Sequence, residues 1–271
     1  MLRERGIEIK TPSQVERMRA AGLVVGETLE LLRSALRAGM TTLDLDRIAE
    51  DSIRASGATP SFKGYHGFPG SICVSVNDEV VHGIPGDRVV ADGDVVSIDC
   101  GAIVDGWHGD AALTIPVGSV PAEVTELIRV TEEALWRGLA AAALGGRVTD
   151  ISHAVETYVR SQGRFGILEE YVGHGIGSAM HQPPNVPNHG RPGKGPRLVE
   201  GLALAVEPMV VAGRPDSRVL DDDWTVVTRD GSPAAHFEHT FTLTPRGTWV
   251  LTALDGGESR LTELGVPFGG S

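Results

Sequence analysis

The chain has 271 residues, of which 41% are hydrophobic and 22% are charged, a composition that is typical of a folded globular protein and excludes global disorder. Its 24 lysines and arginines against 36 aspartates and glutamates give a formal net charge of −12, which disfavours binding to nucleic acid or to anionic membranes. The sequence has no apolar run long enough to span a membrane and no hydrophobic signal segment, and its two cysteines, Cys73 and Cys100, are too few for a disulfide scaffold. We therefore expect a cytoplasmic monomer that binds neither nucleic acid nor membrane.

The first half of the chain is predicted to form two helices followed by strands. Apolar residues recur every three or four positions over 12–36 and again over 43–56, which is typical of amphipathic helices. Thr11 followed three residues later by Gln14 indicates a capping box at the start of the first helix. The strand-like segments that follow are 71–76, 94–104 and 110–116.

The second half repeats this order. Helices are expected over 121–145 and over 149–163, the second capped by Thr149, and strands over 201–211, 224–228 and 236–244. The segment GDVVSIDCG at 93–101 aligns with GLALAVEPM at 201–209, which places Asp99 opposite Glu207. Chance similarity between two α+β segments is the alternative to an internal duplication. The duplication predicts a single domain over 1–271, with pseudo-repeats over about 12–116 and 121–250 related by a pseudo-twofold axis.

Two segments lack a periodic pattern. The stretch between His181 and Arg197 is so rich in proline and glycine that we expect a surface loop without regular structure. The glycine-rich tail over 256–271 is expected to be a short edge segment or loosely held.

Four acidic residues interrupt otherwise apolar strands, and a buried carboxylate is costly unless it is paired or bound to a metal. They are Asp99, Asp110, Glu207 and Glu238. Pairing of each acid with a basic side chain or a backbone donor is one explanation, but these strands contain no basic residues other than histidines. A hairpin between the first two strands would bring Asp99 and Asp110 to one edge of the sheet. Two divalent cations would neutralise all four acids, and their oxygen-rich donor set suits cobalt, manganese, iron or zinc.

Imidazole is a usual partner of carboxylates in such sites, and the chain has nine histidines. His174 is the best placed, since glycines on both sides allow backbone and ligand to approach closely. His181 follows seven residues later, and His82 lies just ahead of the strand with Asp99. A lone histidine is more often a hydrogen-bonded structural residue, and four others are less distinctive: His108, His153, His189 and His236.

Seven sequence blocks, taken together and in order, resemble the type I methionine aminopeptidases of bacteria. The blocks are YHGFPGSICVSVNDEVVHGIP at 65–85, GDVVSIDCG at 93–101, DGWHGDAALT at 105–114, GHGIG at 173–177 with MHQPPNVP at 180–187, AVEPMV at 205–210, DDWTVVT at 222–228 and FEHT at 237–240. The chain departs from the family at Met180, where an aromatic residue is common, and at Phe237 in FEHT, where the family more often has YEHT.

The resemblance implies a pita-bread α/β fold, in which two pseudo-twofold-related halves, each helix, helix and strands, surround a shared sheet. It also implies a metal-dependent hydrolase that removes the N-terminal methionine from nascent proteins and peptides and favours a small second residue. Two divalent metal ions per chain would activate a bridging water. Contact with the ribosome follows only from the expected substrate.

Site residues are implied by the same resemblance, position by position. The metal ligands would be Asp99, Asp110, His174, Glu207 and Glu238. His82 and His181 would contact the substrate and, with Glu207, act in catalysis. The pocket for the methionine side chain would be formed by Tyr65, Cys73, Trp224, Phe62, Phe68 and Met180.

Two other functions are compatible with the same scaffold. A proline-specific peptidase would share the fold, but such relatives usually carry a separate N-terminal domain, whereas this chain begins shortly before its first predicted helix. A non-catalytic binding protein would be expected to have lost metal ligands, whereas all five candidates and both substrate histidines are present.

Overall fold

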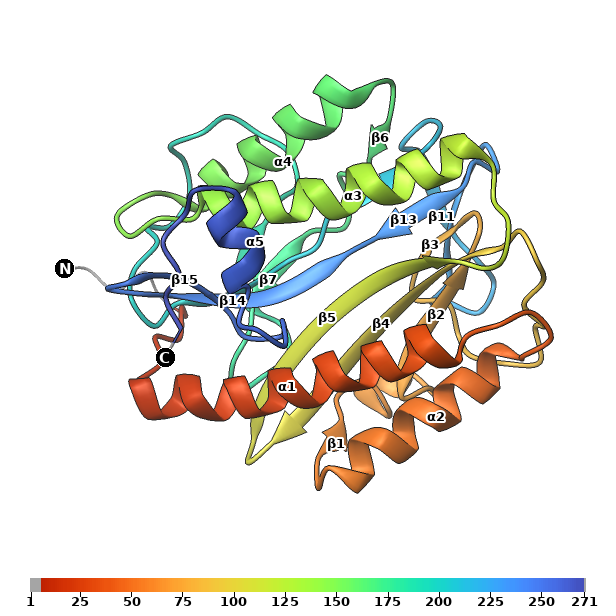
Figure 1. The fold of residues 1–271 in the computed structure, drawn as a ribbon, viewed down its shortest axis with the longest axis horizontal. Coiled ribbons are helices and arrows are strands. Elements are labelled where there is room, and N and C mark those ends of the chain that lie inside the picture. The colour runs from red at the N-terminus through yellow and green to blue at the C-terminus, as the bar shows by residue number, and fades with distance from the viewer. Residues whose placement is uncertain (1–5, 271) are drawn as a thin grey trace.

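The computed structural model describes residues 6–270, and each half contains two helices followed by strands, as expected (Figure 1). The first half consists of α1 (Pro12–Ala35), α2 (Thr42–Ala55), β1 (Thr59–Pro60), the short 3-10 helix η1 (Tyr65–Gly67), β2 (Ile72–Val76), β3 (Glu79–Val81), β4 (Val95–Val104) and β5 (Trp107–Pro116). The second half consists of α3 (Ala122–Ala141), α4 (Val148–Gln162), β6 (Gly166–Ile167), β7 (Gly173–Gly175), β8 (Gln182–Val186), β9 (Ala203–Val206), β10 (Met209–Val211), β11 (Ser217–Val219), β12 (Val226–Thr228), β13 (Ala234–His236), β14 (Glu238–Thr244), β15 (Gly247–Val250) and α5 (Glu258–Glu263).

The two halves share one antiparallel sheet. Among the described residues it has nine strands, with the main order β1-β4-β5-β14-β9-β7-β8, while β2 pairs with β4 and β15 with β14. Two three-stranded sheets, β13-β10-β6 and β11-β12-β3, complete the strand pairing of the described chain. The contact between β5 and β14 joins the halves, because β5 comes from the first and β14 from the second.

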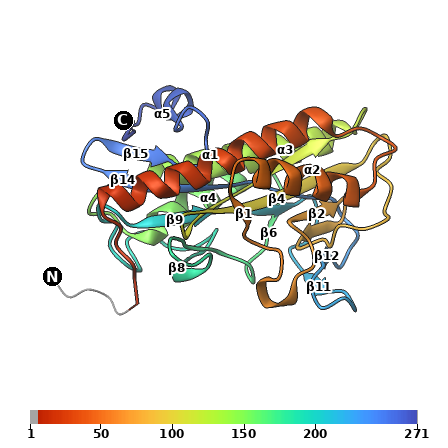
Figure 2. The same ribbon diagram turned by 90° about the horizontal axis from the view of Figure 1, so that it is seen from below.

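Helices cover one face of the main sheet. Figure 2 shows α1 and α2 on one side of the strands, with β8, β11 and β12 on the other. Ile98 and Cys100 of β4 are fully buried in the same core as Leu29 of α1 and Leu45 of α2. Because side chains alternate along a strand, Asp99 faces away from these helices. The acidic residues of the sheet therefore lie on the face opposite α1 and α2.

The long strands predicted over 201–211 and 236–244 are each interrupted. The first divides into β9 and β10 around Glu207 and Pro208, and the second divides into β13 and β14 at Phe237. In both cases the first piece and the second piece belong to different sheets. Pro208 has no backbone N–H for a ladder hydrogen bond, which favours a break there. Glu207 consequently lies at a junction between two sheets and not inside a continuous strand.

Two local expectations were wrong. Arg147 occupies the N-cap of α4, and Thr149, the predicted cap, lies inside the helix with its hydroxyl donating to the Lys194 carbonyl at 3.0 Å. The segment after His181 contains β8, which pairs with β7. Pairing with β7, the preceding strand in the chain, gives this proline-rich segment regular structure that its composition does not favour.

The C-terminal tail agrees with one of its two expectations, a short edge segment, and adds a helix; the sheet position of the acids differs from expectation. The tail contains α5, and Phe268 forms a bridge to Thr248. The strands that carry Asp99 and Asp110, β4 and β5, lie inside the main sheet and not at its edge, because β1 and β2 flank β4 while β14 flanks β5. Within residues 6–270, the helices lack the combination of length and apolarity that crossing a membrane requires.

Candidate metal centre

The β4–β5 hairpin brings the first two acids together. Asp110 pairs with Gly101, and Asp99 pairs with Ala112, so the two aspartates are diagonal neighbours on one face of the sheet. Asp110 is 4% exposed. The hairpin alone therefore places two carboxylates side by side in a buried environment.

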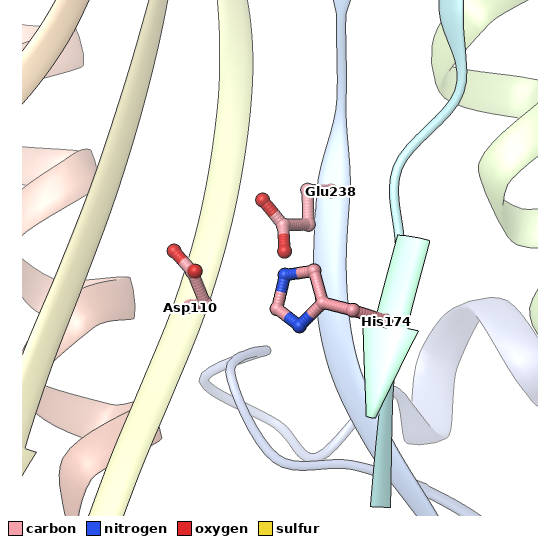
Figure 3. A group of neighbouring side chains, drawn as sticks. All are labelled: Asp110, His174 and Glu238. Carbon is pink, nitrogen blue, oxygen red and sulfur yellow. The ribbon is translucent and has the colours of Figure 1, made fainter. Parts of the chain in front are cut away.

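The second half supplies the other donors. Oxygen or nitrogen atoms of Asp110, His174 and Glu238 lie within 4.8 Å of one another, although they come from β5, β7 and β14. Figure 3 shows the two carboxylates and the imidazole pointing from these three strands towards a common space. Glu207 joins the cluster from the sheet junction, with its Oε1 3.5 Å from His174 Nε2.

Three carboxylates of this cluster each have one oxygen without a partner in the described chain. Asp99 Oδ1, Asp110 Oδ1 and Glu238 Oε1 are buried and have no hydrogen-bond partner among the described residues. Burial raises the pKa of Asp99 to about 7 and that of Glu207 to about 8, and it also raises the pKa values of Asp110 and Glu238. Orphaned carboxylate oxygens beside an imidazole are the donor set that first-row divalent cations bind. The cluster fits a divalent metal site.

All the site residues predicted from the sequence line one cavity of about 150 Å³. They are Phe62, Tyr65, Phe68, Cys73, His82, Asp99, Asp110, His174, Met180, His181, Glu207, Trp224 and Glu238. One side of this cavity is apolar, because Phe62, Phe68, Cys73 and Met180 form a buried cluster. The ring of Trp224 packs edge-on against that of Phe68, with centroids 5.1 Å apart. Donor groups and an apolar pocket therefore share a single space.

Two histidines at the cavity are positioned in different ways, His181 by a side-chain hydrogen bond and His82 by its backbone conformation. The Nδ1 atom of His181 lies 2.9 Å from the Tyr65 hydroxyl, and its ring centroid is 4.3 Å from that of His174. His82 has a left-handed backbone conformation with φ of 60°, which is unfavourable for a residue with a side chain. The next residue is Gly83, where a Cβ would approach the Val74 carbonyl oxygen to 2.2 Å. This turn fixes the position of His82 in the cavity wall.

The segment preceding α1 contacts the turn that carries His181. Glu8 accepts hydrogen bonds from the backbone N–H and hydroxyl of Ser178, at 3.0 and 2.7 Å, and from Gln182 Nε2 at 3.0 Å. Lys10, with a side chain only 1% exposed, donates to the Glu8 carbonyl at 3.1 Å and to Gln182 Oε1 at 3.4 Å. Both ends of the turn are therefore tied to the N-terminal segment.

The sequence interpretation missed His236 as a neighbour of the acids. Ligand-type atoms of Glu207, His236 and Glu238 lie within 4.8 Å of one another, and His236 is 1% exposed. Its position two residues before Glu238 was a usable signal, since such residues share a face in a regular strand. The break at Phe237 and the distant origin of Glu207 are not visible in the sequence.

Comparisons with known proteins agree with this geometry. Residues 16–245 match the family model of metallopeptidase family M24. The chain is 53% identical over 247 residues to the methionine aminopeptidase of Clostridium acetobutylicum, covering 91% of this chain and 98% of that protein. A crystal structure of methionine aminopeptidase from Thermotoga maritima superposes with a TM-score of 0.89 and 43% identity, covering 91% of this chain and 99% of that one.

More distant structures share the fold alone. The prolidase from Pyrococcus furiosus has a TM-score of 0.72 at 21% identity, and covers 90% of this chain and 65% of its own. The predicted pita-bread α/β architecture is thus confirmed, and the family resemblance seen in the sequence blocks is confirmed by identity along almost the whole chain. The chain belongs to metallopeptidase family M24 and, within it, to the methionine aminopeptidases.

Proposed function

We propose that this protein is a metal-dependent aminopeptidase that hydrolyses the N-terminal methionine of nascent proteins and peptides. The single observation that carries this proposal is the cavity in which partnerless carboxylates and an imidazole adjoin an apolar pocket. Family membership at 53% identity supports the same activity and makes a proline-specific peptidase or a non-catalytic binding protein the weaker explanation.

Two divalent ions, drawn from cobalt, manganese, iron or zinc, would be held by Asp99, Asp110, His174, Glu207 and Glu238. When bound, such ions polarise a scissile carbonyl and lower the pKa of a bound water. Four carboxylates balance two dications in charge, which supports two ions per chain. By the family resemblance, Asp110 and Glu238 would be ligands to both ions, Asp99 to one of them, and His174 with Glu207 to the other.

His181 would stabilise the negative charge that develops on the carbonyl oxygen. If the Tyr65 hydroxyl donates to Nδ1, the hydrogen of the imidazole is on Nε2, where it is available to the substrate. His82 would hydrogen-bond the nitrogen of the scissile bond from the opposite wall. Glu207 would accept a proton from the attacking water and transfer it to the leaving amine.

The methionine side chain would occupy the apolar side of the cavity, against Phe62, Phe68, Cys73 and Met180, with Tyr65 and Trp224 beside them. An unbranched thioether suits a pocket lined by aromatic rings and sulfur. The cavity volume of about 150 Å³ is shared by this pocket and the donor cluster, which supports a preference for a small second residue.

Three wider properties belong to the same proposal. Residues 1–271 would form a single catalytic domain built from the two pseudo-repeats, and the protein would act as a cytoplasmic monomer. Its partners would be the N-termini of nascent chains, with transient contact to the ribosome. The net charge of −12 supports the expectation that it binds neither nucleic acid nor membrane.

The test is peptide cleavage after chelation and re-addition of single metals. We expect the chelated protein to release no methionine from Met-Ala-Ser, and at least one of the four cations to restore release. Met-Leu-Ser should be cleaved more slowly than Met-Ala-Ser, and a peptide beginning Ala-Pro should not be cleaved. Failure of every metal to restore cleavage would overturn the proposal, and preferential cleavage of the Ala-Pro peptide would favour a proline-specific enzyme.

A further inference from the structure

Glu207 lies between two imidazoles. His174 Nε2 is 3.5 Å from one carboxylate oxygen, Oε1, and His236 Nε2 is 3.6 Å from the other, Oε2. His174 lines the cavity. His236 is not among the described residues that line it. The two rings thus approach the same carboxylate from different sides, one from the cavity and one from the protein interior.

The backbone of His236 is fixed by the strand that carries Asp110. Its N–H donates to the Thr114 hydroxyl oxygen at 2.9 Å, and that hydroxyl donates to the His236 carbonyl at 2.8 Å. Thr114 is itself 3% exposed and lies in β5. These two hydrogen bonds tie the end of β13 to the centre of the main sheet, so the backbone from which the imidazole extends is held in place.

The Nε2 atom of His236 is buried and has no hydrogen-bond partner among residues 6–270. A buried donor left unpaired costs about 1–3 kcal/mol, so an acceptor is expected beside it. Glu207 Oε2 is a carboxylate oxygen facing Nε2, and a small rotation of either side chain closes the 3.6 Å separation to the ~2.7–3.2 Å of an N–H···O bond.

We propose that His236 is a positioning residue for the metal centre: its Nε2–H donates to Glu207 Oε2 and turns Oε1 towards His174. The inference rests on the proposed role of Glu207 as a metal ligand. Groups that hydrogen-bond a ligating side chain orient it, and their removal typically lowers metal affinity by about 10–100-fold. His236 would therefore determine metal affinity without touching the substrate.

The experiment is a calorimetric titration of chelated protein with Mn²⁺ alone, which requires no enzymatic activity. His236→Leu removes the donor, and His236→Gln retains an N–H at a similar reach. We expect His236→Leu to weaken Mn²⁺ binding about 10–100-fold and His236→Gln to remain within a few-fold of the wild type. Equal affinity of His236→Leu and the wild type would overturn the inference.

His239 provides a matched control. It lies three residues further along, its Nδ1 is 2.8 Å from the Thr252 hydroxyl, and its ring packs against Trp136 with centroids 5.2 Å apart. His239→Gln should bind Mn²⁺ as tightly as the wild type. If His239→Gln weakens binding as much as His236→Leu does, the effect is a general disturbance of the β13–β14 segment and the inference fails.

Two further measurements separate the possible failures. Electron spin-echo spectra of the Mn²⁺-loaded protein should report one coordinated imidazole in the wild type and in His236→Leu; a second imidazole that disappears in the variant would make His236 a ligand and overturn the positioning role. If Glu207→Gln binds Mn²⁺ normally, the proposed ligand set itself is wrong. Should His236→Leu not fold, as judged by circular dichroism, His236→Asn removes the donor at Nε2 with a polar residue and carries the same expectation.

Discussion

Two groups of buried carboxylates in this protein have opposite surroundings. Asp46 of α2 is 6% exposed, and its Oδ1 accepts hydrogen bonds from the backbone N–H groups of Ser71 and Ile72, at 2.6 and 3.1 Å. Asp110 is 4% exposed and has a buried oxygen with no partner in the described chain. Burial raises the pKa of both carboxyl groups. Two backbone N–H groups oppose the rise at Asp46, whereas at Asp110 the carboxylates of Asp99 and Glu207 add to it and one backbone N–H, that of Ala111, opposes it.

The difference separates a structural acid from a ligand. The hydrogen bonds from two backbone N–H groups to Asp46 connect α2 to the start of β2 and partly offset the cost of burying its charge. Asp110 has Asp99 and Glu207 as charged neighbours, which disfavour its ionised form and leave the charge to be balanced from outside the chain. Burial alone therefore does not mark a candidate metal ligand; burial beside other carboxylates, with an oxygen that has no partner among the described residues, does.

The largest effect is expected from substitution of Asp110, a carboxylate with a partnerless oxygen. Asp110→Asn should lower turnover on Met-Ala-Ser by about 10³-fold or more, because a metal contributes several kcal/mol to transition-state stabilisation. Metal content, measured by elemental analysis, should fall with it. The exposed Asp105 of the same hairpin is the control, since Asp105→Asn should change neither quantity. Wild-type metal content and turnover in Asp110→Asn would contradict the distinction between Asp46 as a structural acid and Asp110 as a proposed ligand.

A smaller loss is expected when a cavity histidine is removed and the carboxylates are left intact. His181→Ala should lower turnover by about 10²-fold, as for the loss of one oxyanion donor, while metal content stays at the wild-type level. Tyr65→Phe should produce a smaller loss in the same direction, because it removes only the hydroxyl beside Nδ1. Unchanged turnover in His181→Ala would exclude that residue from catalysis.

Substitution of the hydrogen-bonded acid, Asp46, should change stability and leave metal binding intact. Asp46→Ala leaves two buried backbone N–H groups without an acceptor and should lower the free energy of unfolding by about 1–3 kcal/mol, measured by urea denaturation. Metal content per folded molecule should be unchanged. If Asp46→Ala lost metal but kept its free energy of unfolding, Asp46 would be a metal ligand and not a structural acid.

Lys10 is the cationic counterpart of these buried acids and gives the smallest effect. Burial lowers its pKa from 10.5 to about 8, although Glu8 partly opposes the shift. Between about pH 8 and pH 10.5 the unfolded chain holds a proton at Lys10 that the folded protein does not, so this residue makes stability rise with pH over that interval. The stability of the wild type relative to Lys10→Met, followed by thermal unfolding, should therefore increase from pH 8 to pH 10.5. A difference that is independent of pH would show that Lys10 titrates normally.

Much of the metal centre was predictable because its signals are local. An isolated acid in an apolar strand marks Asp99, Asp110, Glu207 and Glu238 without any knowledge of the fold. The flanking glycines marked His174, and the ordered sequence blocks indicated the residues of the apolar pocket. The structure brings all of them to one cavity.

What could not be predicted depends on contacts between distant segments. The division of the predicted strands at Glu207 and Phe237 follows from exchange between two sheets, whose other strands come from distant parts of the chain. His236 shows the same limit, since its neighbours Thr114 and Glu207 belong to other strands.

The sequence by itself determined the order of helices and strands, the apolar faces and the identity of the acids, because periodicity and the cost of burying charge act over a few neighbouring residues. Only the tertiary structure decided which strands adjoin, where two of them break, and which carboxylates remain without a donor. Those properties depend on the register between strands far apart in the chain, and a shift of one residue would turn the acid of the shifted strand to the opposite face.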